Sequence, residues 1–145
     1  MEQDLLTRLR EREWRLSPQR RVVAEVLVGE HVHLTAEQVH DLARDRLPEI
    51  SRATVYNTLN ELVALGEVGV VDIVDGAKRY DPNTAEAHDH LVCETCHTIR
   101  DVPRAGTRPT VPKRVRDGFL VTGVDVVYRG VCPDCARRHR AGRKR

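Results

Sequence analysis

Hydrophobic residues in the N-terminal part of the chain recur at intervals of three and four, which is the spacing of one face of an α-helix. This pattern predicts three short helices, over residues 4–13, from Pro18 onward, and over residues 36–47. Ser17 and Thr35 precede the second and third helices, where a hydroxyl can accept a hydrogen bond from a first-turn N–H group. The beginning of the chain is therefore expected to be helical.

A fourth helix is expected between Ser51, a suitable N-cap, and Gly66, a suitable C-terminal stop. Its apolar side holds Val55, Leu59, Leu62 and Val63, and the other side holds Arg52, Ala53, Tyr56, Asn57 and Asn60. That second side is polar and thinly charged, as in helices that enter the major groove of DNA, where Asn and Arg read base edges. A helix face that is only solvated has the same pattern, so the pattern alone leaves both interpretations open.

The residues that follow favour the DNA-binding interpretation. Residues 67–74 and 77–81 read as two strands joined by an Asp75-Gly76 turn, which predicts a β-hairpin. Helices followed by a two-stranded wing form a winged helix-turn-helix, a DNA-binding fold. Residues 1–81 are therefore predicted to be a DNA-binding domain.

The second half of the chain has the alternation of short strands. Residues 89–93, 97–102 and 119–131 are expected to form a small antiparallel sheet. Such a sheet has open edges, and pairing two copies would cover surface that a small domain leaves exposed, so a homodimer is expected. The predicted class is α+β, with a hinge at 82–87 and a dimerisation domain at 88–136.

Composition and charge limit this picture. Hydrophobic residues make up 40% of the 145 residues but aromatic residues only 3%, so no single core can be large. Residues 1–87 hold 11 Lys and Arg against 16 Asp and Glu, a net charge of −5, and residues 88–145 hold 13 against 6, a net charge of +7. Six of these cations lie in residues 137–145, which we expect to be a disordered, solubilising tail with at most weak attraction for nucleic acids.

All four cysteines fall into two C-x-x-C pairs, and this spacing presents two thiolates to one tetrahedral ion. Thioredoxin-like redox pairs or two disulfides are the alternatives, but redox motifs do not normally come in matched sets beside His-x-His. The chain shows no secretory signal or membrane-spanning run, and reduced thiols suit the cytoplasm. We predict a structural Zn²⁺ site formed by Cys93, Cys96, Cys132 and Cys135.

Histidine and aspartate next to the first pair indicate a second metal site. His88 and His90 alternate along an expected strand, so both side chains leave the same face, and Asp101 lies on the returning segment. Imidazole and carboxylate ligands suit iron, manganese, nickel or zinc and define a site separate from the cysteines. A histidine-rich strand end at the surface is the alternative.

An enzyme fits the motifs less well. Zinc-dependent nucleotide deaminases also use a C-x-x-C pair, but they need His-x-Glu and a proline directly before the first cysteine. This chain has His88-Asp89-His90 and Val131-Cys132 instead. A dithiol oxidoreductase would carry no cysteine-bound zinc, which metal analysis would reveal. We therefore expect a protein that is not an enzyme.

In combination, these motifs resemble the ferric uptake regulator family of metal-dependent repressors, over about residues 5–138. The motifs are Ser17-Pro18-Gln19-Arg20, Ala53-Thr54-Val55-Tyr56, His88-x-His90 leading into Cys93-x-x-Cys96, and Cys132-x-x-Cys135. Within the family the chain is most similar to the peroxide-sensing branch, which includes actinobacterial repressors of catalase genes. That resemblance implies a regulatory Fe²⁺ or Mn²⁺ ion on His33, Asp81, His88, His90 and Asp101. Iron-sensing relatives usually carry Glu at the position of Asp101.

Two segments depart from the family pattern. The spacing from Asp81 to His88 is one residue longer than in the best-known peroxide sensors. Residues 103–117, where many relatives have a helix, contain several prolines and are expected to be mostly loop.

The resemblance also implies a mechanism. Regulatory metal would lock the hinge and set the distance between the recognition helices of a dimer, which must match the half-sites of a palindromic operator on double-stranded DNA. Peroxide, the only expected small-molecule signal, would oxidise His33 and His88 and release the operators of oxidative-stress genes. An iron- or zinc-responsive repressor without peroxide sensing is the alternative. The expected DNA contacts are Arg20, Arg52, Thr54, Tyr56 and Asn57.

Overall fold

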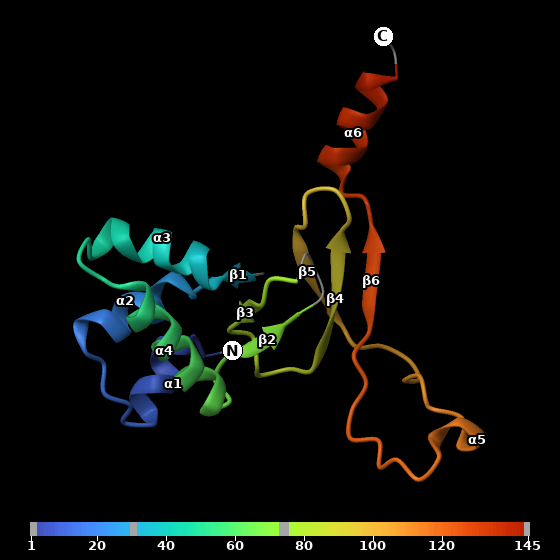
Figure 1. The fold of residues 1–145 in the computed structure, drawn as a ribbon, viewed down its shortest axis with the longest axis horizontal. Helices are drawn as coiled ribbons and strands as arrows, with labels where there is room; N and C mark the ends of the chain where they lie inside the picture. Colours follow the sequence, from blue (N-terminus) through green and yellow to red (C-terminus); the bar gives the residue numbers. More distant parts are fainter. Residues whose placement is uncertain (1–2, 30–31, 73–75, 144–145) are drawn as a thin grey trace. The chain divides into compact units, whose positions relative to one another are not determined.

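A computed structural model describes residues 3–29, 32–72 and 76–143 (Figure 1). The chain forms two compact units, residues 1–86 and residues 87–145. The division falls inside the segment 82–87 that we expected to be a hinge, and its motion stays a prediction. Within the described residues, no helix combines the length and apolar character needed to cross a membrane.

The first unit consists of helices and a small sheet. Its elements are α1 (Leu5–Glu11), α2 (Pro18–Val26), β1 (Leu34–Thr35), α3 (Ala36–Arg46), α4 (Arg52–Ala64), β2 (Gly69–Val71) and β3 (Arg79–Asp81). The predicted caps Ser17, Thr35 and Ser51 all accept a hydrogen bond from a backbone N–H three residues later. Gly66 follows α4 with φ +74°, a conformation that glycine adopts without strain. The helix ends are therefore set locally by these residues.

One apolar core holds the helices of this unit together. Its completely buried side chains include Leu9, Val23, Leu27, Val39, Val55, Leu59 and Leu62. The apolar side of α4 lies in this core, whereas Arg52, Tyr56 and Asn57 on the same helix are exposed. The packing thus determines which side of α4 faces solvent.

The sheet of the first unit has the strand order β1-β3-β2, and both pairs are antiparallel. The expected pairing of β2 with β3 is present, with Val70 opposite Tyr80. Of the predicted turn, Gly76 is described and Asp75 lies outside the described residues, as do positions 73 and 74. The short strand β1, which the sequence pattern did not predict, adds to the free edge of β3.

A buried carboxylate links α1 to the end of the helical segment. Glu67 is 4% exposed and binds two arginines of the N-terminal helix region, Arg8 at 2.6 Å and Arg12. Arg8 also donates a hydrogen bond to the backbone carbonyl of Pro82 at 2.9 Å. These contacts fix the chain directly after β3 to α1.

The second unit has little apolar core. Its elements are β4 (His88–Cys93), β5 (Ile99–Pro103), α5 (Lys113–Arg116), β6 (Val127–Gly130) and α6 (Pro133–Gly142). In the described part of this unit the buried side chains are Asp89, Val92, Cys93, Ile99 and Cys135. The strand order is β5-β4-β6.

The structure corrects three expectations in this unit. β4 pairs antiparallel with β5 but parallel with β6. β5 ends beside the start of β4, and residues 104–126 leave from this end of the sheet and return to it before β6 begins. The strand expected over 119–131 is limited to β6, and residues 119–126 are not in a strand. Residues 137–142, expected to belong to a disordered tail, continue α6. The α+β class itself is confirmed.

Candidate metal centres and nucleic-acid interface

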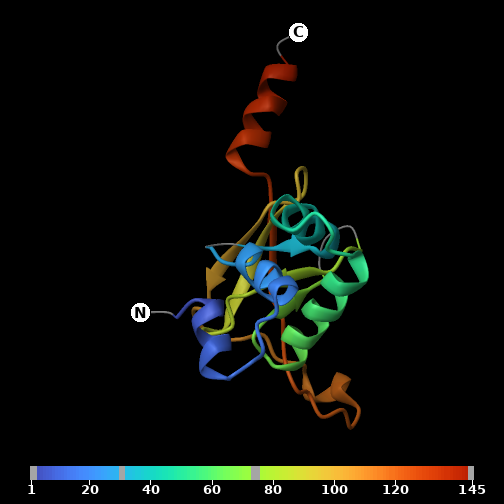
Figure 2. The ribbon, with the colours of Figure 1, turned by 90° about the vertical axis from the view of Figure 1, so that its left-hand side faces the viewer.

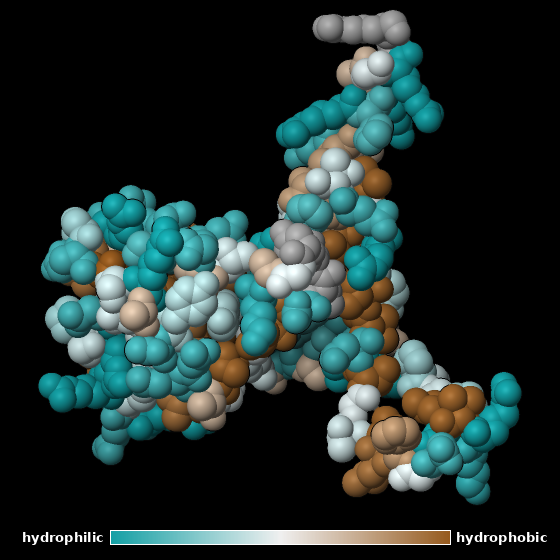
Figure 3. Space-filling model, viewed as in Figure 1, coloured by the Kyte–Doolittle hydropathy of each residue, from teal (hydrophilic) through white to brown (hydrophobic). Residues whose placement is uncertain are grey.

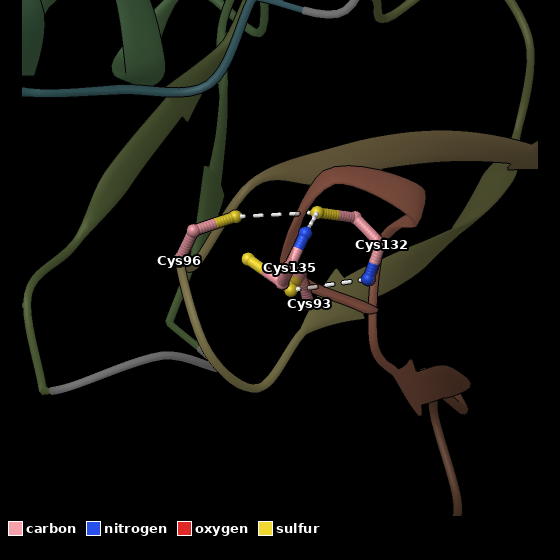
Figure 4. A group of neighbouring side chains, drawn as sticks. All are labelled: Cys93, Cys96, Cys132 and Cys135. Atoms are coloured by element: carbon pink, nitrogen blue, oxygen red, sulfur yellow. Dashed lines mark hydrogen bonds between the residues drawn. The ribbon is translucent and has the colours of Figure 1, made fainter. Parts of the chain in front are cut away.

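The four cysteines come from both ends of the second unit's sequence and meet at one end of its sheet (Figure 4). Cys93 ends β4, and Cys96 lies in the following turn, which closes through a hydrogen bond from the His97 N–H to the Cys93 carbonyl at 2.9 Å. Cys132 is the N-cap of α6, and Cys135 lies in the first turn of that helix. The turn after β4 and the N-terminus of α6 therefore each present one C-x-x-C pair.

The distances between the sulfur atoms fit one tetrahedral metal ion. All four cysteines are free thiols, and their Sγ atoms lie within 4.8 Å of one another. The Cys96 and Cys132 sulfurs are 3.7 Å apart, far beyond the roughly 2.05 Å of a disulfide bond. Two sulfurs at about 2.3 Å from a tetrahedral zinc are about 3.8 Å apart. The cluster fits zinc and does not fit the disulfide alternative.

Hydrogen bonds favour the thiolate form at two of the four cysteines, Cys93 and Cys96. Backbone N–H groups of Cys96 and Cys132 lower the pKa of Cys93 to about 6, with the Cys132 N–H at 3.3 Å from the Cys93 sulfur. The hydroxyl of Thr98, 3.2 Å from the Cys96 sulfur, lowers the pKa of Cys96. The hydrogen bond to Cys132, together with burial, raises the pKa of Cys135 to about 12. Cys135 would therefore hold its proton more strongly than Cys93 or Cys96, and metal binding would have to displace it.

A separate group of nitrogen and oxygen ligands lies on the sheet of the second unit. Asp101 on β5 is directly opposite His90 on β4. Its Oδ1 atom is 3.8 Å from His90 Nε2 and 3.3 Å from His88 Nε2, and the two imidazole rings are 4.9 Å apart. The predicted common face of His88 and His90 is therefore confirmed. Atoms about 2.1 Å from one metal are roughly 3 to 4 Å apart, so this trio has suitable spacing for shared ligation.

The first unit contributes a second, smaller group of the same chemistry. His33 precedes β1 and Asp81 ends β3, and the β1–β3 pairing brings the two side chains together. His33 Nε2 is 3.4 Å from Asp81 Oδ2, and both side chains are buried. A buried imidazole beside a buried carboxylate is a common feature of metal ligand sets.

The exposed side of α4 is the candidate DNA-reading surface. The side chain of Arg52 is 65% exposed and lies 3.4 Å from Glu37, and Tyr56 is 42% exposed. Asn57 and Asn60 are exposed on the same helix. These side chains offer donors and acceptors to a nucleic acid without disturbing the core.

Besides Arg52, two further predicted DNA contacts are engaged within the protein. Arg20 lies 4.6 Å from the ring centre of Trp14 and donates to Glu61 at 2.6 Å. The Thr54 hydroxyl accepts a hydrogen bond from Ser51 at 2.9 Å and so belongs to the N-cap of α4. Both residues stay predictions as DNA contacts, and each would have to exchange a contact that it already makes.

Sequence reasoning missed a buried ionic cluster on β4. Asp89 is 3% exposed and accepts two hydrogen bonds from Arg108, at 2.6 and 2.9 Å, with Arg104 at 3.4 Å. The Arg108 hydrogen bonds lower the pKa of Asp89 and raise that of Arg108. Arg108 also donates to the Val124 carbonyl at 3.2 Å. The cluster ties the otherwise exposed segment 104–126 to the sheet. The one sequence signal for it was that Asp89 alternates with His88 and His90 along the strand, which places the Asp89 side chain on the opposite face of the sheet.

A winged helix with an exposed polar recognition face, in a chain that also carries two kinds of metal-ligand group, defines a metal-responsive transcriptional regulator. Residues 11–129 match the sequence profile of the "Ferric uptake regulator family". The chain belongs to this family, as the resemblance predicted.

Named relatives extend over nearly the whole chain. It is 34% identical over 134 residues to "Transcriptional regulator FurA" of Mycobacterium tuberculosis, covering 92% of this chain and 90% of the relative. It is 33% identical over 135 residues to "Peroxide-responsive repressor PerR" of Staphylococcus saprophyticus, with the same coverage of 92% and 90%. Both names describe regulators of transcription, which is not an enzymatic role.

Solved structures share the fold. The Campylobacter jejuni peroxide stress regulator is 28% identical with a TM-score of 0.61, and the match covers 93% of this chain and 100% of that one. A structure described as "zinc-bound manganese uptake regulator" has a TM-score of 0.67 at 24% identity, covering 90% of this chain and 99% of that one. The second likeness concerns the fold alone.

Proposed function

We propose that this protein is a metal-dependent repressor that senses peroxide. The observation that carries the proposal is the trio of His88, His90 and Asp101, in which the two histidine nitrogens lie 3.3 and 3.8 Å from Asp101 Oδ1, apart from the cysteine cluster. In this proposal the buried pair His33 and Asp81 joins the trio on one regulatory Fe²⁺ or Mn²⁺ ion. Nitrogen and oxygen donors suit these metals better than thiolates do.

The four cysteines are assigned to a structural Zn²⁺ ion. Their sulfur spacing and lowered pKa values at Cys93 and Cys96 support this assignment. A thiolate cage with four protein ligands leaves no open position for a substrate, so its role is to hold β4 and α6 together. The chemistry of sensing is therefore assigned to the histidines and aspartates.

The proposed control of DNA binding rests on the two units. If residues from both units hold one ion, metal binding restricts the segment 82–87 and thereby selects one arrangement of the units. In a homodimer, that arrangement sets the spacing of two α4 helices on a palindromic operator of double-stranded DNA. Exposed apolar side chains in the second unit, such as Val115, Phe119 and Leu120, support a homodimer because association would cover them. We place the regulator in the cytoplasm, where thiols stay reduced.

Peroxide sensing requires a ligand that changes chemically. A bound Fe²⁺ ion would supply electrons for the reduction of hydrogen peroxide, a reaction that Mn²⁺ does not readily support. His33 and His88 are the proposed targets, each gaining one oxygen atom and losing strength as a ligand. His33 is buried beside Asp81, so an oxidant formed at the metal would reach it more readily than one dissolved in water.

A second candidate is a repressor that responds to iron or zinc without sensing peroxide. This candidate is supported by the sequence identities, which are similar for a FurA regulator, 34%, and a PerR repressor, 33%. A substitution of Asp101 can distinguish the two candidates, because the aspartate side chain is shorter than that of glutamate and holds its carboxylate in a different position relative to the metal. Asp101→Glu should keep metal-dependent DNA binding and weaken the peroxide response.

The decisive experiment compares the Fe²⁺ and Mn²⁺ forms of the zinc-loaded protein. The DNA is a palindromic duplex selected from a random-sequence pool by the Mn²⁺ form. Brief peroxide treatment should release DNA from the Fe²⁺ form and spare the Mn²⁺ form, with one added oxygen on peptides that contain His33 or His88. Unmodified histidines, with Cys93 and Cys96 oxidised at the dose that releases DNA, would show a thiol sensor instead.

A further inference from the structure

The C-terminal helix α6 extends away from the rest of the second unit. Figures 1 and 2 both show it running beyond the ends of β4 and β6. After Cys135, which is 3% exposed, and the half-buried Ala136, every described side chain up to residue 143 is exposed. The outer turns of this helix therefore contribute nothing to the core of the unit, and packing does not explain their sequence.

The charge on these outer turns has one sign. Arg137, Arg138, Arg140 and Arg143 lie there with His139, and the acid of the helix is Asp134, which pairs with Arg137. Like charges three and four positions apart on a helix repel each other, although cations near a helix C-terminus interact favourably with its dipole. A helix of ten residues is marginal by itself in water, so an anion that neutralises these arginines would stabilise it.

The residue type indicates which anion. A helix end that only needs to be soluble usually mixes both charge signs, but the outer turns of α6 carry no acid after Asp134. Arginine presents a planar fork of N–H donors that binds phosphate oxygens in pairs.

In Figure 3 the surface over α6 is mainly hydrophilic, whereas hydrophobic side chains gather around α5. The two helices of the unit thus offer surfaces for different kinds of partner.

The attachment of α6 makes it a defined arm. Cys132 caps the helix by accepting a hydrogen bond from the Cys135 N–H at 3.5 Å, and Pro133 occupies the first turn. The cysteine cluster that fits zinc thus also fixes the start and the direction of the helix. The arginines therefore lie on a helix whose first turn is anchored, and an anion would have to stabilise only its outer turns.

We propose that α6 binds the phosphate backbone of DNA and adds a sequence-independent contribution to operator affinity. This inference rests on the proposed DNA-binding function. The arginines neutralise phosphates and release condensed counterions, so their effect depends on salt but not on base sequence. The first unit carries a net negative charge, which makes a cationic contribution from the second unit useful for association with DNA.

The test is a triple variant, Arg138→Ala, Arg140→Ala and Arg143→Ala, which leaves the Arg137–Asp134 pair in place. The matched control is Lys113→Ala, Arg114→Ala and Arg116→Ala on α5, which removes the same number of exposed cations. Both are prepared as full-length zinc- and Mn²⁺-loaded protein and checked for zinc content and dimerisation. Binding is measured by fluorescence anisotropy against salt, on the selected palindrome and on an arbitrary duplex of equal length.

The α6 variant should bind both duplexes more weakly by the same factor. The slope of log K against log salt should fall in magnitude by about 0.9 for each lost phosphate contact, and the control should keep the wild-type slope. An unchanged slope in the α6 variant, or an equal change of slope in the α5 control, would overturn the inference. It would also be overturned if the α6 variant aggregated more readily but bound DNA with wild-type affinity. If the wild-type protein bound neither duplex, the proposed DNA-binding function itself would fail.

Discussion

The two units of the chain are stabilised in different ways. The first unit surrounds a continuous apolar core to which all four of its described helices contribute. The second unit buries only Val92 and Ile99 as ordinary apolar side chains, together with two cysteines and Asp89, in its described residues. The first unit thus has the means to fold through hydrophobic burial, whereas the second depends on bonds between specific polar groups.

This difference explains where metal is needed. Structural zinc contributes roughly 10–16 kcal/mol in small peptides, comparable with the whole stability of a typical domain. The first unit could fold without such a contribution, whereas in the second unit it would decide whether the unit folds. The proposed DNA-reading helix α4 thus lies in the unit that has its own core, and the cysteine cluster that fits zinc lies in the unit with little apolar core.

The largest expected effect comes from removing a thiolate. Cys93→Ser should lose zinc and unfold the second unit, since serine is a poor zinc ligand, while the first unit stays folded. Hydrogen exchange followed by mass spectrometry would resolve the two units, and the fluorescence of Trp14, the single tryptophan, reports on the first. Thr95→Ser in the same turn is the control and should bind zinc normally. A zinc-free variant with a protected second unit would contradict the comparison.

Shortening a side chain in the apolar core should destabilise the first unit and leave the zinc content of the second unit unchanged. Leu59→Ala leaves a cavity beneath α4 and should lower the free energy of unfolding of this unit by about 2–5 kcal/mol. Urea denaturation monitored by Trp14 fluorescence measures the loss. Leu42→Ala, at a side chain that is 45% exposed, should change it by less than about 0.5 kcal/mol. Equal losses at both positions would argue against a packed apolar core.

Substitutions on the exposed side of α4 should separate recognition from stability. Arg52→Ala and Tyr56→Ala should each weaken operator binding, by about 1–3 kcal/mol for a lost base contact, with zinc content and unfolding unchanged. Binding titrations at several salt concentrations distinguish base contacts from phosphate contacts. Arg46→Ala on α3, also exposed, provides the matched loss of charge. Wild-type affinity in both α4 variants would place recognition elsewhere.

The finest test concerns Asp89 and acid pH. The Arg108 hydrogen bonds lower the pKa of Asp89 in the folded protein, so their stabilisation is present above the unfolded pKa of about 3.9 and is lost as pH falls through the folded value. Asp89→Asn should therefore melt at a lower temperature than wild type at pH 6, with the difference shrinking below about pH 4. Thermal unfolding followed by circular dichroism across this range measures it. A difference that is the same at pH 3 and pH 6 would rule out an ionic origin.

Local features of the sequence were sufficient for much of the fold and of the candidate site. Hydroxyl caps at Ser17, Thr35 and Ser51 act within four residues, so they could be identified without any knowledge of the tertiary structure. The two C-x-x-C pairs and the alternation of His88 with His90 likewise depend only on spacing along a turn or a strand. Such short-range geometry is nearly independent of the rest of the chain.

Long-range contacts decided the remainder. The parallel direction of β6 depends on the path of residues 104–126, which have no periodic pattern to predict it. Charged residues gave no sign of their partners: Glu67 meets arginines near the N-terminus, and Asp89 meets Arg108. The helical state of residues 137–142 follows from a cap at Cys132, whose spacing suggested only a metal ligand. The sequence by itself determined the capped helices of the first unit and the spacing of the candidate ligands. Only the tertiary structure decided which distant groups meet, because those contacts depend on how the chain returns on itself.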